Sequence, residues 1–518
     1  MSPALLAAAS DKVSAPSIAY HALAPILIVL AVAGLGVLIE AFVPTSERFY
    51  AQLTVALAGL IAAFVVIALL HDTEISTVGG ALAIDGTGLF IQATIVVLAL
   101  LSFLLLAERG VDTGSAIVAQ AALVVGSARD RELNRTDRVQ TEIFPLGMFA
   151  VAGMMIFSVS NNLLLMFIAL EVLSLPLYLM AGLSRRRRLL SQESALKYFL
   201  LGAFASAFFL YGLALLYGYA NSVDLSTILT ATQDSSHSQI LLYLGLALLL
   251  AGLFFKAGIA PFHNWTPDVY QGAPTPVTAF MATCTKVAAF AAILRVLYVG
   301  FSATSWEWRP VVWAVAIASM IVGAVFGLTQ TDLKRILAYS SIAHAGFLLV
   351  GLTAVTADAI SGTMFYLLSY GLATVAAFGL TTLVRDADGE AARLSQWAGL
   401  ARKSPLVAVT MTVLLMSMAG IPLTAGFVGK LVIFKAAWSD AGPLVVIALL
   451  ASAVSAFYYL RIVVLMFFAE PPENAPSIAV PSAATTIAVS FSGAATLVLG
   501  IIPQPLLELA SRSAFLHK

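Results

Sequence analysis

Hydrophobic residues gather in long runs along the chain, and short polar connections separate these runs. A run of about 18–25 apolar residues has the length of an α-helix that crosses a membrane. The sequence therefore predicts an all-α polytopic membrane protein with about 14 transmembrane helices. The expected spans are residues 18–43, 49–70, 86–107, 143–159, 161–183, 193–219, 238–271, 276–300, 310–329, 332–354, 358–384, 404–438, 442–469 and 484–503.

Glycine and proline interrupt two of these spans, the seventh and the twelfth. In the seventh, Gly258 loosens the helix and Pro261 removes a backbone donor, and Gly420 and Pro422 do the same in the twelfth. Both breaks begin with Ala-Gly-Ile. Because the breaks lie five spans apart, the two copies enter the membrane from opposite sides. We therefore predict two inverted five-helix repeats with broken helices 7 and 12, as in secondary transporters.

This repeat sets the domain organisation that we expect. Residues 1–142 contain three N-terminal helices and a polar loop, 143–300 form the first inverted repeat with helices 4–8, 301–470 form the second with helices 9–13, and 471–518 contain a C-terminal helix.

Two connections are long enough to carry structure of their own. Within the polar loop, the apolar stretch 116–126 is too short to cross a membrane and is expected to be interfacial or buried. In the connection 385–403, Leu394 and Trp397 indicate an amphipathic segment on the membrane surface.

Composition narrows the class of protein. Of the 518 residues, 60% are hydrophobic and 10% are charged, and the formal net charge is zero. A soluble protein of this length would need a more polar surface, so a lipid bilayer is the expected environment. With a net charge of zero, the sequence gives no indication of a basic face that would bind nucleic acid. The single cysteine, Cys284, excludes an internal disulfide and a cysteine-ligated metal or iron–sulfur site on this chain.

Basic residues in the connections predict the orientation. Connections after even-numbered spans hold only Arg309, and those after odd-numbered spans hold many more. Because cytoplasmic loops are enriched in Lys and Arg, we expect the odd connections in the cytoplasm and both termini on the outer side of a bacterial cytoplasmic membrane. No basic segment precedes an apolar core at the start, so we expect no cleaved signal peptide. The basic residues of the odd connections are Arg48, Arg109, Arg129, Arg131, Arg135, Arg138, Arg185, Arg186, Arg187, Arg188, Lys334, Arg335, Arg385, Arg393, Arg402 and Lys403, and we interpret them as topology signals.

Four ionisable residues lie inside apolar segments and are the main candidates for function. They are Glu171, Lys256, Lys286 and Lys430. Ionisable groups within membrane spans are costly and usually mark an ion or proton path. An apolar environment favours the neutral form of a lysine, and a nearby carboxylate favours the charged form, so moving the carboxylate makes the lysine release its proton. We expect Glu171 and Lys256 to form such a switchable pair. Lys435 is assigned to the interface between membrane and water.

Three further residues are secondary candidates. Lys197 follows Glu193 by four residues, a spacing that fits a simple helix ion pair as well as a relay role. His344 lies between Lys286 and Lys430 in the sequence, and a neutral imidazole could bridge two lysines, although a lone buried histidine is more often structural. His263, on the short helix expected after the first break, could gate the path.

Three segments of the chain are similar to a known family. They are FKAGIAPFHNWTPDVYQGAPTPVTAF, LKRILAYSSIAHAGF and GIPLTAGFVGK. Together they closely resemble subunit N of bacterial proton-pumping NADH–quinone oxidoreductase, respiratory complex I, over residues 143–470. The resemblance implies a fold of 14 helices with two inverted five-helix units. It places the family's glutamate of helix 5 on Glu171, its lysine of helix 6 on Lys197, and its lysines of helices 7, 8 and 12 on Lys256, Lys286 and Lys430. Leu423 departs from the family pattern, which often has a second proline there.

The resemblance also implies which molecules surround the chain. NADH, FMN, iron–sulfur clusters and quinone would bind to other subunits, with no cofactor on this chain. Its partners would be membrane-arm subunits, including a neighbouring antiporter-like subunit and small connecting subunits. The alternatives are a subunit of a multi-subunit sodium/proton antiporter or of a membrane-bound hydrogenase, which share the fold but often have a glutamate at the position of Lys430. A purely structural scaffold would leave the buried charges unexplained.

Overall fold

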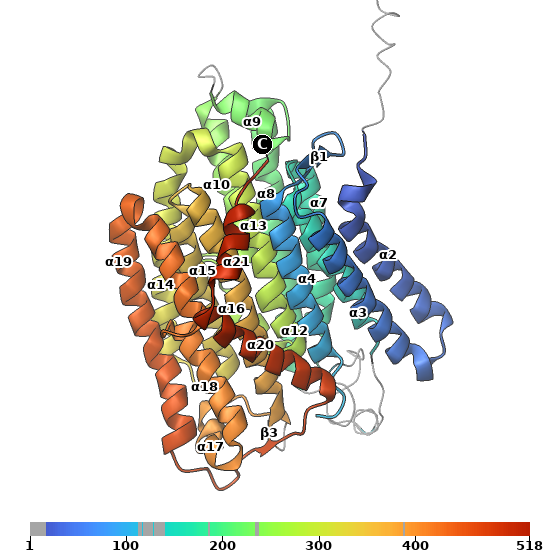
Figure 1. The fold of residues 1–518 in the computed structure, drawn as a ribbon, viewed down its shortest axis with the longest axis vertical. Helices are drawn as coiled ribbons and strands as arrows, with labels where there is room; N and C mark the ends of the chain where they lie inside the picture. The colour runs from blue at the N-terminus through green and yellow to red at the C-terminus, as the bar shows by residue number, and fades with distance from the viewer. Residues whose placement is uncertain are drawn as a thin grey trace, which may run out of the picture.

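The protein is a bundle of long helices (Figure 1). The structure is a computed structural model that describes residues 17–111, 117, 128, 140–184, 187–233, 238–386 and 389–517. Within these ranges, twelve helices are long and apolar enough to cross a membrane. The prediction of an all-helical polytopic membrane protein is therefore confirmed. The predicted interfacial stretch 116–126 lies outside the described residues apart from Ile117.

The helices of membrane-spanning length follow the predicted spans closely. They are α2 (Tyr20–Phe42), α3 (Thr45–Leu69), α4 (Gly86–Leu106), α7 (Leu163–Ala181), α8 (Arg188–Ala220), α10 (Gln239–Ala257), the continuous segment Thr275–Gly300, α14 (which runs Ser305–Thr329), α15 (Leu333–Leu352), α16 (Ala357–Leu383), α19 (Ala425–Phe468) and α20 (Ala483–Ile501). Two apolar helices are shorter, α6 (Ile143–Val159) and α18 (Pro405–Ala419).

Helix α19 covers two of the predicted spans. It is 44 residues long, and Ala441 in its middle has a non-helical backbone with φ −140° and ψ 34°. Pro443 follows two residues later and lacks the backbone donor that a continuous helix needs. The element is therefore two helices that meet at a kink, which agrees with the predicted spans 404–438 and 442–469.

Short helices and strands lie in the connections. The sequence predicted two of them, the short helix after the first break and the segment around Leu394 and Trp397, but not the others. The helices are α9 (Leu225–Thr232), α11 (Trp265–Gly272), α17 (Leu400–Lys403), η4 (Ser302–Thr304), η5 (Leu394–Trp397) and α21 (Gln504–Arg512). The strands are β1 (Ile75–Thr77) and β2 (Leu82–Ile84), which pair antiparallel, and β4 (Gly389–Glu390), β3 (Val384–Asp386) and β5 (Ser477–Ile478), which form an antiparallel sheet in that order.

The segment around Leu394 and Trp397 does not lie on the membrane surface, so that prediction was wrong. Both side chains are buried in the protein, and the Trp397 indole donates a hydrogen bond of 2.8 Å to the main-chain oxygen of Ala391. The apolar residues that suggested an amphipathic surface helix instead pack against α19. Sequence pattern alone cannot distinguish a lipid partner from a protein partner, because both are apolar.

The two predicted breaks have the same backbone construction. Helix α10 ends at Gly258 with φ 70°, and α18 ends at Gly420 with φ 87°. In each case the glycine and the following isoleucine donate to carbonyl groups of the last turn: Gly258 to Phe255 and Ile259 to Phe254, and Gly420 to Ser417 and Ile421 to Met416. This is the Schellman arrangement, which needs a left-handed residue and so favours glycine. The repeated Ala-Gly-Ile therefore ends both helices with the same C-terminal capping motif.

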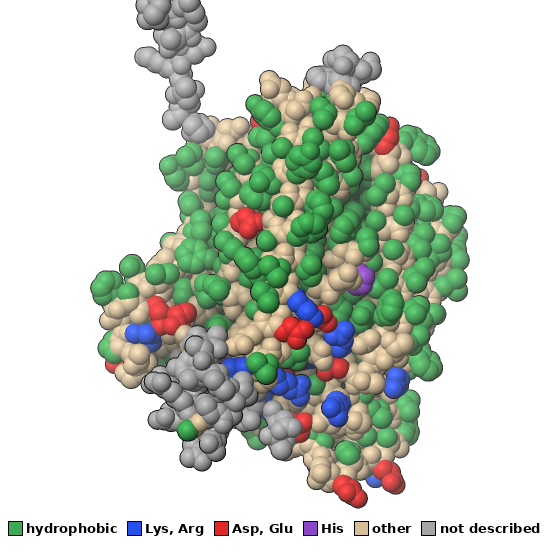
Figure 2. Space-filling view, turned by 180° about the vertical axis from the view of Figure 1, so that it is seen from behind, with side chains coloured by type: hydrophobic (Ala, Val, Ile, Leu, Met, Phe, Trp, Pro, Cys, Tyr) green, Lys and Arg blue, Asp and Glu red, His purple; other side chains and the backbone are tan. Residues whose placement is uncertain are grey.

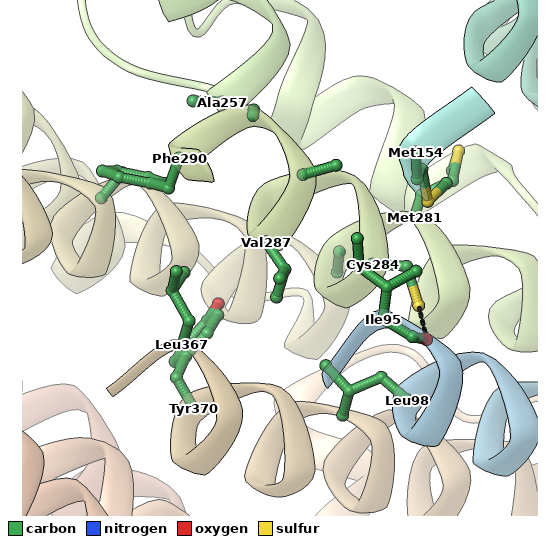
Figure 3. Close-up of a cluster of buried hydrophobic side chains, with 14 of the residues drawn as sticks. Ile95, Leu98, Met154, Ala257, Met281, Cys284, Val287, Phe290, Leu367 and Tyr370 are labelled. Carbon is green, nitrogen blue, oxygen red and sulfur yellow. Dashed lines mark hydrogen bonds between the residues drawn. The ribbon is translucent and has the colours of Figure 1, made fainter. Parts of the chain in front are cut away.

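The segment Thr275–Gly300 is the most enclosed helix of the bundle. It is divided into α12 (Thr275–Phe280), the π-helical η2 (Met281–Thr285), α13 (Lys286–Arg295) and the π-helical η3 (Val296–Gly300). Figure 3 shows its packing: Cys284 points at α4, where its thiol donates to the main-chain oxygen of Ile95, and Leu367 and Tyr370 of α16 approach Val287. Short π-helical segments inside α-helices often occur at functional sites.

Both described ends of the chain lie at the same end of the bundle, together with α9 and β1, whereas α17 and β3 lie at the opposite end (Figure 1). A buried ion pair fixes the C-terminal residues there: Arg295 contacts Asp85 at 2.9 Å, and the backbone of His517 donates to Asp85 at 2.9 Å. On the face shown in Figure 2, the basic side chains lie in the lower half, and hydrophobic side chains cover most of the upper half.

Candidate functional site

Lys256 lies in the last turn of α10, where the structure buries it. Its ammonium group donates hydrogen bonds to the hydroxyl groups of Ser174, at 2.8 Å, and Tyr198, at 3.3 Å. The end of a helix is a favourable place for a cation, because the unpaired carbonyl groups there carry partial negative charge. The sequence predicted this lysine but gave no indication of the two hydroxyl groups that hold it.

Glu171 lies on α7, three residues before Ser174. Residues three apart face the same side of a helix, so Glu171 lies on the side of α7 that faces Lys256. The two groups interact electrostatically, but they form no ion pair, because the hydrogen-bond partners of the ammonium are hydroxyl groups. Glu171 Oε1 is buried without a hydrogen-bond partner among the described residues. The predicted partners are therefore neighbours without direct contact.

Aromatic rings line the pocket of Lys256. Its ammonium nitrogen lies 5.8 Å from the ring centre of Tyr178 and 5.4 Å from that of Tyr198. The Tyr198 ring in turn stacks on Trp265 of α11, with centroids 4.7 Å apart. The Trp265 indole donates to the main-chain oxygen of Phe255 in the last turn of α10, which ties the two halves of the broken helix together. Ring faces attract cations, so this lining accommodates the charged lysine without a carboxylate.

Lys286 is the first residue of α13 and follows the π-helical segment η2 directly. Its side chain is buried, and its ammonium donates a hydrogen bond of 2.5 Å to the main-chain oxygen of Ser341 on α15. It also lies 5.7 Å from the ring centre of Tyr370 on α16. The lysine of the first predicted repeat thus reaches acceptors on helices of the second.

His344 lies on α15 between the two lysines, as its place in the sequence suggested. One ring nitrogen is hydrogen-bonded to the hydroxyl of Tyr366, and the other lies 3.3 Å from the hydroxyl of Tyr459. Its ring centre is 4.7 Å from that of Tyr370, which contacts Lys286, and 5.6 Å from that of Phe347. The tyrosines were not predicted; their only signal in the sequence was a hydroxyl group in an apolar segment.

Lys430 is buried on α19 and reaches back across the second break. Its ammonium donates to the main-chain oxygens of Met418, at 2.9 Å, and Ala419, at 3.0 Å, and to the hydroxyl of Ser452, at 2.8 Å. It lies 4.8 Å from the ring centre of Phe347. Carbonyl groups in the last turn of a helix have no partner within it, so the break itself supplies the acceptors for this lysine.

A cavity of about 380 Å³ lies beside Lys430. Its lining extends from Gly420 and Lys430 to Lys435 and Trp438, which are exposed near the kink of α19. Of Lys256, Lys286 and Lys430, only Lys430 lines this cavity, which offers space toward an end of the bundle. Lys435 lies at the exposed end, which agrees with its assignment to the interface.

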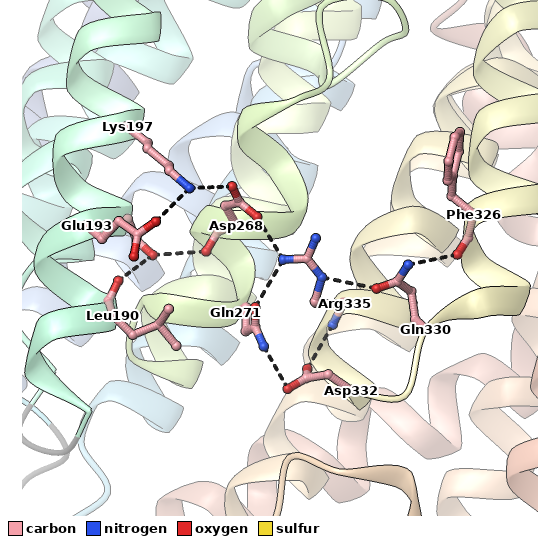
Figure 4. Close-up of polar contacts among 10 residues, drawn as sticks. Leu190, Glu193, Lys197, Asp268, Gln271, Phe326, Gln330, Asp332 and Arg335 are labelled. Atoms are coloured by element: carbon pink, nitrogen blue, oxygen red, sulfur yellow. Dashed lines mark hydrogen bonds and ion pairs between the residues drawn. The ribbon is translucent and has the colours of Figure 1, made fainter.

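Lys197 belongs to a chain of alternating charges at the end of the bundle that carries α17 and β3 (Figure 4). Its ammonium lies 2.7 Å from Glu193 and 2.8 Å from Asp268 of α11. The other oxygen of Asp268 accepts from Arg335 of α15 at 2.7 Å, and Arg335 also donates to Gln271. The predicted ion pair of Lys197 is present, but it is part of a larger network that reaches Arg335 on α15.

Asp268 is the residue of this network that the sequence analysis missed. It follows Pro267 in a segment that is polar by composition, so it resembled an ordinary turn residue. The network also corrects the interpretation of Lys334 and Arg335 as topology signals alone: Arg335 is paired with Asp268, and Lys334 is buried and donates to the main-chain oxygen of Ala273 at 2.8 Å.

A polar cavity of about 190 Å³ opens at this network. Its lining residues share a polar or charged character apart from one leucine; they are Leu190, Glu193, Ser194, Lys197, Asp268, Gln271 and Arg335. Ser194 and Tyr198 lie four residues apart on one face of α8, and Tyr198 is the partner of Lys256. Ser194, which lines the cavity, is therefore about one helical turn, roughly 5 Å along α8, from Tyr198.

His263 lies in the link between α10 and α11 and not on a helix, because α11 begins only at Trp265. Its Nδ1 atom is buried without a hydrogen-bond partner in the described ranges. No contact in those ranges joins it to Lys256 or Lys286. The structure therefore gives the expected gating residue a different local setting from the one predicted.

The side chains that the structure brings together can hold and pass protons. Among the residues that the structure describes, no group of three or more His, Cys, Asp or Glu side chains could hold a metal ion. What the structure brings together is a row of buried basic groups on neighbouring helices, with hydroxyl and carbonyl oxygens between them.

Comparisons with known proteins agree with this picture. A family model described as NADH:quinone oxidoreductase/Mrp antiporter, TM, matches residues 160–455. The chain is 57% identical over 508 residues to NADH-quinone oxidoreductase subunit N of Parafrankia sp. (strain EAN1pec), which covers 98% of this chain and 97% of that protein.

Solved structures share the fold. A chain of respiratory complex I from Thermus thermophilus is 35% identical with a TM-score of 0.76, covering 94% of this chain and 99% of that one. A chain of the Mrp complex from Dietzia sp. DQ12-45-1b has a TM-score of 0.79 at 23% identity, covering 96% of this chain and 97% of that one. The second likeness concerns the fold alone.

Proposed function

Because the chain belongs to the subunit N family of NADH-quinone oxidoreductase, a family of proton-translocating antiporter-like membrane subunits, we propose a specific proton path through it. The path begins at Glu171 and Lys256, continues through Lys286 and His344, and ends at Lys430. Electron transfer from NADH to quinone in other subunits drives proton movement along this path.

One observation carries the proposal: each of the three lysines is buried and held only by neutral acceptors. Lys256 donates to two hydroxyl groups, Lys286 to a carbonyl oxygen, and Lys430 to two carbonyl oxygens and a hydroxyl. No carboxylate in the described part of the chain forms an ion pair with any of them. A full ion pair would keep a lysine charged, whereas neutral acceptors let it hold and release a proton.

The polar cavity beside Asp268 and the cavity beside Lys430 give the path two ends. The first is lined by charged residues and by Ser194, one turn of α8 from the Tyr198 that contacts Lys256. The second extends from Lys430 toward Trp438. We assign proton uptake to the first and release to the second, with Lys197 in the uptake cavity as a secondary site. His263 is a candidate gate between the halves of the first broken helix.

The proposed architecture is 14 crossings with two inverted five-helix repeats. Residues 143–300 form the first repeat and 301–470 the second, preceded by 1–142 and followed by 471–518. The identical ends of α10 and α18 support this division, and so does the kink at Ala441, which separates two crossings within α19. The short apolar helix α6 adds one crossing, and α18 forms a single crossing together with the first half of α19.

We assign both termini to the outer side of a bacterial cytoplasmic membrane. The ends of the chain share one end of the bundle, and the basic side chains in Figure 2 lie toward the other. Cysteine placed at the exposed Ser226 of α9 should react with a membrane-impermeant reagent added outside, and cysteine at the exposed Ser395 should not. The native Cys284 is buried and should not interfere.

The remaining parts of the machinery lie on partner chains. NADH, FMN, iron–sulfur clusters and quinone bind to other subunits, and this chain contacts a neighbouring antiporter-like subunit and the small connecting subunits of the membrane arm. A sodium/proton antiporter or membrane-bound hydrogenase subunit is the alternative, but the identity to subunit N over nearly the whole chain favours complex I.

The test is proton uptake by inside-out membrane vesicles during NADH oxidation. Lys286→Ala should leave electron transfer in the assembled complex but abolish most of the proton uptake. Lys403→Ala is the matched control, because this lysine is exposed on α17 and lies outside the proposed path. Normal proton uptake per electron in Lys286→Ala would refute the path.

A further inference from the structure

At the break between α18 and α19, the backbone of α20 packs directly against the backbone of the break, with no side chain between them. Gly500 lies at the end of α20, and a Cβ atom added to it would lie 2.4 Å from the main-chain oxygen of Leu423 and 2.4 Å from the Cα atom of Thr424. Non-bonded carbon atoms are normally about 3.5–4.0 Å apart, so no side chain fits here unless a backbone moves. Glycine is therefore required for the approach of the two segments.

The backbone on which Gly500 presses is in an uncommon conformation. Leu423 has φ 69°, a region that residues with a Cβ atom rarely adopt. Its side chain is 68% exposed, so packing of that side chain does not hold the conformation. Strained residues of this kind persist only where the surrounding structure restrains them. The close contact with α20 is such a restraint.

A short series of contacts connects this point to Lys430. The Thr424 hydroxyl donates to the main-chain oxygen of Ile421 at 2.6 Å, and the Ile421 backbone donates to Met416 in the last turn of α18 at 3.0 Å. The same turn provides the oxygens of Met418 and Ala419 that accept from Lys430. The position of Thr424 thus fixes the groups that hold the ammonium.

The first break has a corresponding contact. The backbone of Ala260, between α10 and α11, donates a hydrogen bond of 3.0 Å to the hydroxyl of Ser319 on α14. Helix α14 follows the segment 143–300, just as α20 follows the segment 301–470. Each break is therefore contacted by the long helix that follows its segment, α14 after 143–300 and α20 after 301–470, although the residues that make the contact differ.

We propose that α20 positions Lys430 for proton release, with Gly500 as the residue that transmits the position of the helix to the break. A shift of α20 moves Leu423 and Thr424, and with them the carbonyl groups that accept from the ammonium. Because α20 also packs against α4 and α16 (Figure 1), it links the N-terminal helices to the end of the path. The inference rests on the proposed function, since that function gives Lys430 its role.

The test uses the whole complex in inside-out vesicles. Gly500→Ala should leave NADH–quinone electron transfer intact, lower proton uptake per electron, and shift the pH profile of uptake. A loss of packing alone would lower the amount of complex without moving that profile. Gly493→Ala on the same helix is the matched control, because its Cβ would meet only a Thr410 methyl group at an ordinary 3.6 Å.

A second variant decides the question if Gly500→Ala does not assemble. Thr424→Val keeps the shape of the side chain but removes the hydrogen bond to Ile421, so it should also shift the pH profile of uptake. Unchanged profiles in Thr424→Val and in any assembled Gly500→Ala complex would overturn the proposal. If these variants are normal while Lys430→Ala fails to pump, only the positioning by α20 is refuted. If Lys430→Ala itself pumps normally, the proposed function fails as well.

Discussion

The ammonium group of Lys430 donates a hydrogen bond of 3.0 Å to the main-chain oxygen of Ala419, the last residue of α18. In an unbroken helix this oxygen would accept from a backbone amide four residues later. The break removes that amide and leaves the oxygen free for a side chain. The same feature that interrupts the helix therefore creates the site that binds the lysine.

This relationship predicts graded effects of substitution at Lys430. Lys430→Ala should abolish most proton uptake, because no other group at the break carries a proton. Lys430→Arg should also fail, since a guanidinium does not release its proton at physiological pH. Ser452→Ala should be milder, because two carbonyl acceptors remain. The measurement is NADH-driven proton uptake in vesicles, with recovery of the whole complex as the control. Normal proton uptake in both Lys430→Ala and Lys430→Arg would show that Lys430 is only an interfacial anchor and carries no proton.

Ser174 is predicted to matter because it, and not Glu171, directly holds Lys256. A hydrogen bond to a charged group contributes about 1.5–3 kcal/mol, which corresponds to roughly tenfold or more in an equilibrium constant. Ser174→Ala should therefore slow proton uptake by about tenfold, and Ser174→Thr, which keeps the hydroxyl, should retain most of it. Steady-state uptake rates at fixed electron-transfer rate provide the comparison. Equal rates in the two variants would show that the hydroxyl is dispensable.

Asp268 is predicted to contribute more to pumping than to stability. Its side chain is 33% exposed, and exposed ion pairs contribute only about 0.2–1 kcal/mol each. Asp268→Asn should thus leave the assembled complex nearly as stable, but it cuts the charge network between Lys197 and Arg335 and should lower proton uptake. Glu193→Gln is the control, because in this variant Asp268 still pairs with both Lys197 and Arg335. A larger defect in Glu193→Gln than in Asp268→Asn would contradict the bridging role.

Leu423 is predicted to tolerate glycine but not proline. A left-handed conformation costs a residue with a Cβ about 1–2 kcal/mol, and glycine avoids this but loses about 0.5–1 kcal/mol through its greater freedom when unfolded. Leu423→Gly should therefore be neutral or stabilising by about 1 kcal/mol. Leu423→Pro should destabilise the subunit, because the ring fixes φ near −65° while the structure needs 69°. The temperature at which the subunit dissociates from the purified complex would measure the stability of both variants. Equal dissociation temperatures for Leu423→Gly and Leu423→Pro would contradict a strained backbone at Leu423.

Glu108 accepts hydrogen bonds from Ser482, the residue directly before α20. We predict that low pH weakens this attachment of α20. Burial raises the pKa of this carboxyl, but the nearby Thr485 hydroxyl and hydrogen bonds from Ser482 and Gly110 outweigh burial, so its pKa is lowered. A depressed folded-state pKa stabilises the protein above the unfolded value of about 4.3, and the contribution is lost as pH falls through the folded-state pKa.

The variant Glu108→Gln tests this pH dependence. Its thermal stability should fall below that of the unaltered protein at pH 7, and the difference between the two should shrink as the pH is lowered below about 4.3. A difference that stays constant with pH would show that the contact depends on shape and not on charge.

The sequence by itself determined the features that depend on local chemistry. The length of each apolar run fixed which segments become long helices, since a bilayer accepts only backbone whose polar groups are paired internally. Gly258 and Gly420 fixed the two breaks, because only glycine readily takes the left-handed conformation that ends those helices. The cost of burying a charge marked Lys256, Lys286 and Lys430 as candidates for function before any partner was known.

The tertiary structure alone decided what each of these groups touches. Ser174 and Tyr198 reach Lys256 from other helices, and Asp268 reaches Lys197 from α11. Their positions depend on which helix faces pack together. Apolar faces look alike in sequence, so periodicity cannot tell a lipid contact from a helix contact, as the buried Trp397 demonstrates. The contact of Gly500 with Leu423 joins residues far apart in the chain, and only close packing of two backbones makes that glycine necessary.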